Sequence, residues 1–338
     1  MIKVKNLYKS YSDKEVLKGI NFTVNNGEVL GFLGPNGAGK STTMNIITGY
    51  ISSTSGTVTI DGIDIIKEPI KAKKMIGYLP EKPPLYMDMT VKSYLGFMFD
   101  LKKIKIDKKS HIENVCEIVG ISDVYNRTIK KLSKGYKQRV GIAQALLGEP
   151  KVIILDEPTV GLDPKQVISI RNLIKNLSYN HTIILSSHIL SEIQAVCDRV
   201  VVINDGKVVA DGSAEDISKE ASGVITLKLQ VDGDKNTVFN AINDIEGIID
   251  IDSEREVDTQ VCEYIVKYYK DNDIRRDVFK KLAEVNCPII EMYSSSPSLE
   301  DVFLMLTEKD DVRSNKDVNY NEPEKASKMG DENNDSNI

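Results

Sequence analysis

Gly34-Pro35-Asn36-Gly37-Ala38-Gly39-Lys40-Ser41 fits the phosphate-loop pattern, in which a glycine and four variable residues precede Gly-Lys-Ser or Gly-Lys-Thr. The apolar run at 29–33 predicts a buried strand before it, and 41–47 is compatible with a helix after it. Small residues in the loop let backbone N–H groups approach an anion, and the helix start adds partial positive charge. Lys40 would reach the β- and γ-phosphates, and the Ser41 hydroxyl would bind Mg²⁺. A glycine-rich turn that binds nothing is the alternative.

The whole chain has the size and composition of a soluble globular protein with two domains. It has 338 residues, of which 41% are hydrophobic and 28% charged, and no apolar run approaches the length of a membrane span. Met1–Asn6 lacks the apolar core of a signal peptide, so we expect a cytoplasmic protein. The formal net charge of −6 argues against a nucleic-acid-binding protein. No C-x-x-C pair occurs, so free thiols are expected at Cys116, Cys197, Cys262 and Cys287.

Short apolar strands alternate with helical segments over the first two thirds of the chain, which predicts an α/β fold around a buried parallel sheet. The pattern changes near 213–222, and the order β-α-β-β-α-β that follows is typical of a ferredoxin-like fold. We therefore expect a first domain at 1–217, a small accessory α+β domain at 222–306 and a disordered polar tail at 308–338. A last helix is expected with Ser298 as its cap and a common face formed by Leu299, Val302, Phe303 and Leu306.

Asp156 and Glu157 follow an apolar run at 152–155, so a buried strand would carry two adjacent carboxylates at its C-terminal end. Ligands bind at that end of the strands in open α/β sheets. Asp156 would hold Mg²⁺ through water, and Glu157 would orient or deprotonate an attacking water. Asp-Glu-Pro also fits the start of a helix, but its place after a strand in a chain with a phosphate loop favours a hydrolytic site.

Three further groups are weaker signals when each is taken alone. Ser133, Lys134 and Gly135 precede a helical segment at 140–147, so they could bind an anion or simply cap the helix. His188 follows the strand at 182–185 and could bond a γ-phosphate, or it is an ordinary loop residue. Tyr11 could stack on adenine through its flat face, or it is an aromatic residue at a strand end.

Residues 1 to about 217 resemble the nucleotide-binding subunit of an ATP-binding cassette (ABC) transporter, because seven motifs occur in that family's order. They are an aromatic residue, the Walker A loop, a Q-loop equivalent, the signature, Walker B, a D-loop and a switch histidine. In this chain they are Tyr11, 34–41, 77–81, 132–136, 153–157, 161–163 and His188. The resemblance implies a P-loop cassette, with a parallel sheet core and antiparallel and helical subdomains, that binds ATP and Mg²⁺.

The resemblance also implies roles for single residues. Glu157 would be the catalytic base, His188 would sense the γ-phosphate, and Tyr11 would stack on adenine. Magnesium ligands would be Ser41, Glu81 and Asp156. The other nucleotide-binding residues would be Gly34, Pro35, Asn36, Gly37, Ala38, Gly39, Lys40, Thr42, Ser133, Lys134 and Gly135.

The chain departs from the family pattern at two motifs. The signature usually reads Leu-Ser-Gly-Gly-Gln, whereas Lys134 and Tyr136 replace a glycine and the glutamine here; we expect function to survive. Glu81 stands where the family usually has glutamine, and it adds negative charge near Asp156 and Glu157. The Gly77-to-Glu81 loop, the single cassette and the ending at 297–303 resemble bacterial exporter ATPases of the drug, bacteriocin, sodium or gliding-motility type.

Membership of this family implies specific partners. Two cassettes pair head to tail, so that Ser133 and Gly135 of one cover the ATP on Lys40 of the other, in a homodimer or a heterodimer with a paralogous ATPase. The dimer would drive an integral membrane permease from the inner face of the cell membrane, without contacting nucleic acid. The alternative is a soluble ABC ATPase of translation or DNA repair, but neither a second cassette nor a long coiled-coil insertion occurs here. A purely regulatory binding module would lack the equivalents of Glu157 and His188.

Overall fold

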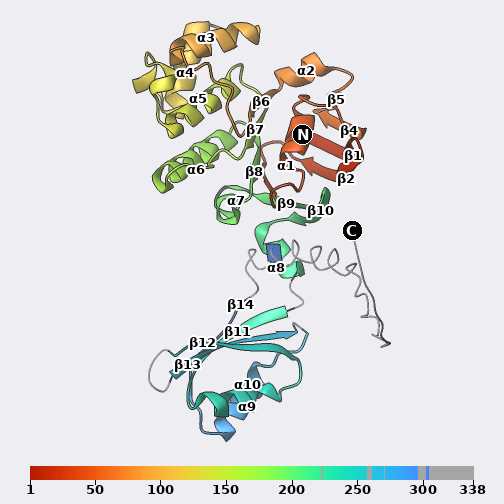
Figure 1. Cartoon of the computed structure of the whole chain (residues 1–338), viewed down its shortest axis with the longest axis vertical. Helices are drawn as coiled ribbons and strands as arrows, with labels where there is room; N and C mark the ends of the chain where they lie inside the picture. The colour runs from red at the N-terminus through yellow and green to blue at the C-terminus, as the bar shows by residue number, and fades with distance from the viewer. Residues whose placement is uncertain (222–223, 257–260, 270, 296–301, 304–338) are drawn as a thin grey trace, which may run out of the picture.

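The computed structural model describes residues 1–221, 224–256, 261–269, 271–295 and 302–303. Within these residues the chain forms three β-sheets, two in its N-terminal part and one small sheet near its C-terminus (Figure 1). No described helix combines the length and the apolar character that crossing a bilayer requires. The expected cap Ser298, the residues Leu299 and Leu306, and the tail at 308–338 lie outside the described residues.

The central sheet has six strands in the order β10-β9-β3-β8-β7-β6, and all neighbours are parallel except β10 and β9. Its strands are β3 (Val29–Leu33), β6 (Ile76–Leu79), β7 (Val152–Asp156), β8 (Thr182–Ser187), β9 (Arg199–Asn204) and β10 (Lys207–Gly212). Because β3, β7 and β8 are parallel neighbours, the loops that follow them start at the same edge of the sheet. The predicted parallel α/β core is confirmed.

Side chains of the central sheet alternate between two apolar cores, one on each face. Leu30 and Phe32 belong to the core that also contains the antiparallel sheet and α1. Val29 and Leu33 belong to the core shared with the helices of the opposite face. The strand β3 is therefore buried on both sides, which explains why its five residues form an unbroken apolar run.

The second sheet is antiparallel, with the strand order β2-β1-β4-β5. It consists of β1 (Ile2–Tyr11), β2 (Lys14–Val24), β4 (Ser55–Ile60) and β5 (Ile63–Asp64). The helices of the N-terminal part are α1 (Lys40–Ile47), α2 (Pro69–Lys74), α3 (Val91–Leu101), α4 (Lys108–Val119), α5 (Lys134–Leu146), α6 (Pro164–Ser178), α7 (Leu190–Val196) and α8 (Ala214–Ala221). Two short 3₁₀ turns, η1 (Ser122–Val124) and η2 (Ile129–Lys131), join α4 to α5. In Figure 1, α3, α4 and α5 gather on the side of the central sheet away from the antiparallel sheet.

The small C-terminal sheet has the order β12-β13-β11-β14 with all neighbours antiparallel, which is the strand order of a ferredoxin-like fold. Its elements are β11 (Val224–Asp232), α9 (Lys235–Asn243), β12 (Ile248–Glu256), β13 (Val261–Tyr269), α10 (Arg275–Glu284) and β14 (Ile289–Ser295). These elements enclose an apolar core of their own. Val302 and Phe303 belong elsewhere, because Val302 is fully buried in the cluster that contains Ile217 of α8, and Phe303 packs against that cluster.

Two strands, β5 and β10, and two α-helices, α2 and α8, were not expected from the sequence. The helix α2 begins at Pro69 and has only six residues, which is too short to show a helical period. The turn Asp205-Gly206 joins β9 and β10 in a hairpin. The α8 segment was expected only as the boundary between two domains, where the sequence pattern changes. Instead it forms a helix whose Ile217 is buried.

Candidate nucleotide-binding site

The phosphate-loop residues connect the end of β3 to the start of α1, and two of their glycines have a left-handed backbone. Gly37 has a φ of 85° and Gly39 a φ of 108°, values that side chains of L-residues rarely tolerate. A Cβ on Gly34 would lie 2.3 Å from the carbonyl oxygen of Ile203. The glycines are therefore required by the local backbone and packing, whatever the loop binds.

Lys40 lies inside the loop, with 6% of its surface exposed. Its Nζ donates to the carbonyl oxygens of Gly34 at 2.7 Å and Pro35 at 3.2 Å, and Glu157 Oε1 lies 3.7 Å away. Burial lowers the pKa of Lys40, while the nearby carboxylates of Glu157 and Asp156 act in the opposite direction. The Lys40 ammonium is thus held at the N-terminus of α1 by carbonyl oxygens, and a phosphate oxygen could replace them as its partner.

Asp156 and Glu157 stand at the end of β7, and Ser186 on the neighbouring β8 fixes both. The Ser186 hydroxyl donates to Asp156 Oδ1 at 2.5 Å, and the Glu157 N–H donates to Ser186 Oγ at 3.0 Å. The two carboxyl residues are 2% and 7% exposed. Glu157 also has a φ of 50°, an uncommon value for a residue other than glycine. This backbone turn separates the directions of two adjacent carboxylates.

Glu157 links the lysine and histidine of the site. Its Oε1 faces Lys40, and its Oε2 lies 2.9 Å from Nδ1 of His188, whose side chain is 40% exposed. The histidine reaches this position because β8 ends at Ser187, directly beside the end of β7. Residues that follow the three parallel strands β3, β7 and β8 therefore meet at the carboxylate of Glu157.

A cavity of about 510 Å³ lies in front of these groups. It is large enough for a nucleotide, and loop glycines, a lysine and two glutamates line it. Its wall is formed by Val16, Asn36, Gly37, Gly39, Lys40, Ser41, Thr42, Glu81, Glu157, Val160 and His188. Most residues of the expected nucleotide set within the loop thus line one cavity. Gly34, Pro35 and Ala38 shape the loop without lining the cavity.

The expected magnesium ligands lie between this cavity and a second one of about 720 Å³. Ser41 and Glu81 line both cavities, whereas Asp156 lines only the second. Among the described residues no group of three or more His, Cys, Asp or Glu side chains could hold a metal without other ligands. A hydroxyl and one or two carboxylates fit Mg²⁺, which binds through few protein oxygens together with substrate phosphates. The residues present therefore fit this ion.

Two groups of expected site residues are not part of the first cavity. Tyr11 ends β1, is 48% exposed and has the Lys9 ammonium 4.7 Å from its ring centroid. Ser133, Lys134 and Gly135 form the start of α5, where the Ser133 hydroxyl accepts from the Tyr136 N–H at 3.4 Å. Within this chain, the helix start at α5 and the cavity at α1 are separate features.

Sequence reasoning missed two polar residues that support the site. Ser186 holds Asp156 and Glu157 as described above. Glu192 in α7 is 5% exposed and accepts hydrogen bonds from the hydroxyls of Thr159 and Ser187, the latter at 3.1 Å. It thereby joins the segment after Glu157 to the segment that carries His188. The only sequence signal was an acidic residue in the first turn of a short helix, which is common on exposed helices as well.

Comparison with known proteins gives the family of the chain. Residues 17–160 match the family model of the ABC transporter. The chain is 33% identical over 317 residues to the linearmycin resistance ATP-binding protein of Bacillus subtilis, with 91% of this chain and 98% of the relative covered. It is 34% identical to the bacitracin transport ATP-binding protein of Bacillus licheniformis, with 90% and 97% covered.

Solved structures agree with this assignment. The ATP-binding subunit of an ABC transporter is similar with a TM-score of 0.59 and 30% identity, over 65% of this chain and 92% of the other. A dimeric bacterial ABC transporter cassette is similar with a TM-score of 0.58 and 28% identity, over 63% of this chain and 98% of the other. Its fold, site geometry and relatives together show that the chain belongs to the ABC transporter family, as an ATP-binding subunit that hydrolyses ATP.

Proposed function

We propose that two cassettes, both from this chain or one from a paralogue, close head to tail around ATP and Mg²⁺, and that hydrolysis drives export through a separate membrane permease. One observation carries the proposal. Lys40, Glu157 and His188 converge on one cavity, whereas Ser133 and Gly135 lie at another helix start that does not line it. A site that needs both sets is complete only when a second cassette supplies the second set.

The residues of the cavity divide the work of hydrolysis. Lys40 and the backbone amides of the loop bind the phosphates, and Lys40 neutralises part of their charge. Glu157 accepts the proton of the attacking water, because its carboxylate faces the cavity and its neighbours hold it in place. His188 holds the γ-phosphate through the ring nitrogen that does not face Glu157. Ser41 and Asp156 would hold Mg²⁺, which supplies further charge neutralisation when bound.

Export is supported by the relatives and by the second cavity. Two relatives are named for linearmycin resistance and bacitracin transport, which suggests compounds of that kind as the class of substrate. The second cavity has apolar and basic walls that include Tyr50, Lys73 and Met98. Because it shares Ser41 and Glu81 with the nucleotide cavity, a permease segment seated there would touch residues beside the phosphates. The protein would thus work at the inner face of the cell membrane.

The small C-terminal sheet belongs in this proposal as an accessory domain for regulation or dimer support. It has a core of its own, without a residue in common with the two cores of the N-terminal part. Deleting the residues after 217 would test the expected bounds of this domain, 222–306, beside a cassette at 1–217, and it would also remove Val302 from the N-terminal core. We expect the isolated cassette to retain ATP binding.

The proposal is tested with Glu157→Gln, which removes the base but keeps the size of the side chain. With ATP and Mg²⁺ this variant should run as a dimer in size-exclusion chromatography with light scattering, and its turnover should fall by about 10²–10⁴-fold. Glu117→Gln is the matched control, because Glu117 is an exposed residue of α4. We expect the control to hydrolyse ATP like the unaltered chain.

Two outcomes would contradict the proposal. The first is a Glu157→Gln protein that stays monomeric while it binds ATP, because closure would then not depend on a second cassette. The second is turnover that falls equally in the Glu117→Gln control, because the effect would then be one of total charge. A dimer that forms with ATP and Mg²⁺ but not with ADP supports the proposal, since it reports the γ-phosphate.

A further inference from the structure

The second cavity has two rims, formed by α2 on one side and α3 on the other. Lys73 of α2 and Met98 of α3 both line it, together with Lys102, which follows α3. In Figure 1 both helices lie at the same end of the N-terminal part. Each rim is part of a short, largely exposed segment, 64–74 on the α2 side and 100–109 on the α3 side.

Both segments are positively charged although the whole chain is acidic. Segment 64–74 has four lysines and two carboxylates, and segment 100–109 has five lysines and two carboxylates, in a chain with a formal net charge of −6. Lys67 and Lys74 on one rim, and Lys103 and Lys105 on the other, are exposed. The backbone N–H of Lys67 donates to Asp64 Oδ1 at 3.1 Å, but none of the four ammonium groups makes an ion pair or hydrogen bond within the described part of the chain. We call these four residues the rim lysines.

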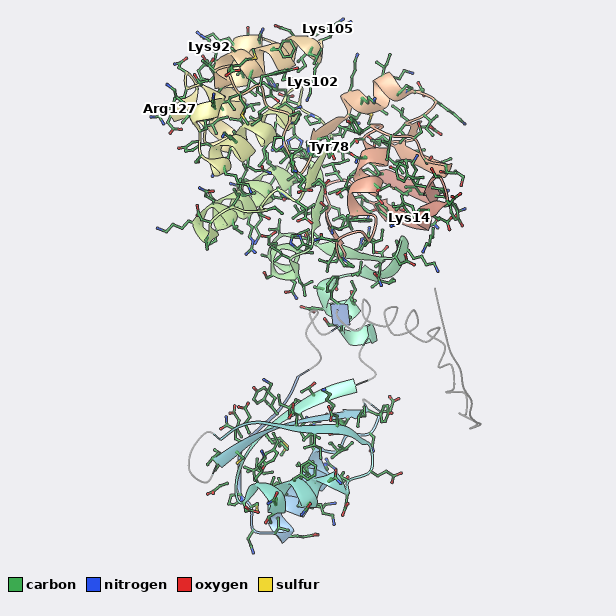
Figure 2. All side chains as sticks on the ribbon, viewed as in Figure 1. Lys14, Tyr78, Lys92, Lys102, Lys105 and Arg127 are labelled. Carbon is green, nitrogen blue, oxygen red and sulfur yellow. The ribbon has the colours of Figure 1, made fainter. Side chains whose placement is uncertain are left out.

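The neighbouring Lys102 differs from the rim lysines because its ammonium is hydrogen-bonded within the fold. Its Nζ donates to the carbonyl oxygens of Gln144 and Leu147, each at 3.0 Å, at the end of α5. Burial lowers the pKa of Lys102 to about 8. Figure 2 labels Lys102 and Lys105 on the same side of the molecule, far from Lys14. Lys102 supports the fold, whereas the rim lysines have no such task among the described residues.

Exposed aliphatic side chains accompany the lysines on both rims. Ile66 and Ile70 are 57% and 74% exposed on the α2 side, and Leu101 and Ile106 are 62% and 47% exposed on the α3 side. Each lies next to a lysine in the sequence or one helical turn from it. Aliphatic tips beside long cationic side chains are typical of surfaces that enter the headgroup region of a bilayer.

We propose that the two rims rest on the bilayer and that the rim lysines bind anionic lipid headgroups on either side of the permease seated in the cavity between them. This inference rests on the proposed function, because it needs the cavity to face a membrane protein. An acidic protein segment is less suitable as the partner, because a segment that fills the cavity would leave exposed aliphatic tips on both rims uncovered. A flat anionic surface contacts both rims at once and adds the attraction of each lysine.

The test uses the full-length chain and sedimentation with vesicles, without nucleotide or permease. Vesicles of phosphatidylcholine mixed with phosphatidylglycerol should bind the chain, and vesicles of phosphatidylcholine alone should not. Raising NaCl from about 0.1 to about 1 M shortens the Debye length from about 10 to about 3 Å and should release most of the protein. The rim variant K67A/K74A/K103A/K105A should bind the anionic vesicles at least about tenfold more weakly.

The matched control is K3A/K5A/K14A/K175A, which removes four exposed lysines from other surfaces and changes the net charge equally. It should bind like the unaltered chain, and both variants should keep full ATPase activity in solution, which shows that they are folded. A third variant, I70S/L101S, should weaken binding at both salt concentrations, because its loss is apolar rather than electrostatic.

Three outcomes would overturn the inference: no binding of the unaltered chain to anionic vesicles, equal binding by the rim variant, or an equal loss in the control. A rim variant that binds vesicles normally but no longer copurifies with a permease would assign the rims to an acidic protein segment. Failure of the lipid proposal stays separable from failure of the proposed function, because the ATP-dependent dimer of Glu157→Gln is measured without any membrane.

Discussion

Two helices of this protein begin in loops suited to binding a phosphate, and the rest of the chain surrounds them very differently. At the start of α1, Lys40 is almost completely buried and faces Glu157, and His188 completes a cavity. At the start of α5, Ser133 and Lys134 are exposed and line no described cavity. The first helix start is thus built into a site, whereas the second one is presented to the outside.

This difference explains how one sequence can encode two loops suited to binding an anion without making two sites. An α-helix start offers N–H donors and partial positive charge in either place, so the backbone alone does not distinguish them. The distinction lies in side chains. The Lys134 side chain packs on Gly161, because a Cβ added to Gly161 would lie 2.1 Å from the Lys134 Nζ. The Gln166 side chain packs on Gly135 in the same way. The loop at the start of α5 therefore packs against the loop before α6 and the first turn of α6. It has no catalytic group of its own.

The sharpest test of the comparison is complementation between the two helix starts, and it has the largest expected effect. Lys40→Ala removes the buried cation, and Ser133→Asp keeps a good helix cap while placing a negative charge where a phosphate would bind. Each variant alone should lose about 10²–10³-fold in ATPase activity. Mixed in equal amounts, they should recover activity up to about one quarter of that of the unaltered chain, because half the dimers then carry one intact site.

Controls separate this effect from a damaged fold. Ser133→Asn also caps the helix but carries no charge, so it should keep most of the activity. In the Glu157→Gln background, the mixture of the two variants should form an ATP-dependent dimer, whereas neither variant alone should. A mixture that is as inactive as its components, and that forms no dimer in this background, would show that each chain uses its own two loops.

The sequence predicted the first helix start well because its requirements are local. Gly37 and Gly39 need a left-handed backbone, and Lys40 and Ser41 follow directly, so one short stretch carries the whole pattern. Asp156 and Glu157 were also found from a local signal, an apolar strand followed by two carboxylates. The parallel order of β3, β8 and β7 then places these stretches together, as expected for an α/β fold.

Residues whose role depends on distant contacts were not predicted. Ser186 is one of two adjacent serines, and only the pairing of β7 with β8 shows that it holds both carboxyl residues. Val302 was assigned to the C-terminal α+β region by its place in the sequence, yet it is buried in the N-terminal part. An apolar helix face shows in the sequence that a helix is packed, but not whether it packs on the adjacent domain or on the core of an earlier one.

Glu192 tests how strongly the first site depends on its buried support, and we expect an intermediate effect. Glu192→Ala leaves the hydroxyls of Thr159 and Ser187 without their acceptor, which should lower the free energy of unfolding by about 1–3 kcal/mol. If about 1.4 kcal/mol of that support is also lost in the transition state, kcat falls about tenfold.

The control variants for Glu192 separate positioning from general destabilisation. Glu192→Gln keeps one acceptor oxygen and should restore most of kcat, whereas the exposed Glu113→Ala should change stability by less than about 0.5 kcal/mol. Chemical denaturation and steady-state kinetics measure the two effects. A Glu192→Ala protein that is destabilised but has normal kcat would show that this carboxylate supports the fold and not the site.

Tyr11 is expected to give the smallest effect, because it lies outside the cavity and one face of its ring is near Lys9. If adenine stacks on the other face, Tyr11→Ala should raise the KM for ATP about fivefold, since an aromatic contact is worth about 1 kcal/mol. Its kcat should not change, because Glu157 and His188 keep their contacts, and Tyr11→Phe should behave like the unaltered chain. Tyr179→Ala is the control, because Tyr179 is 85% exposed at the end of α6. An unchanged KM in Tyr11→Ala would show that Tyr11 does not stack on adenine. It would then be only an aromatic residue at the end of β1.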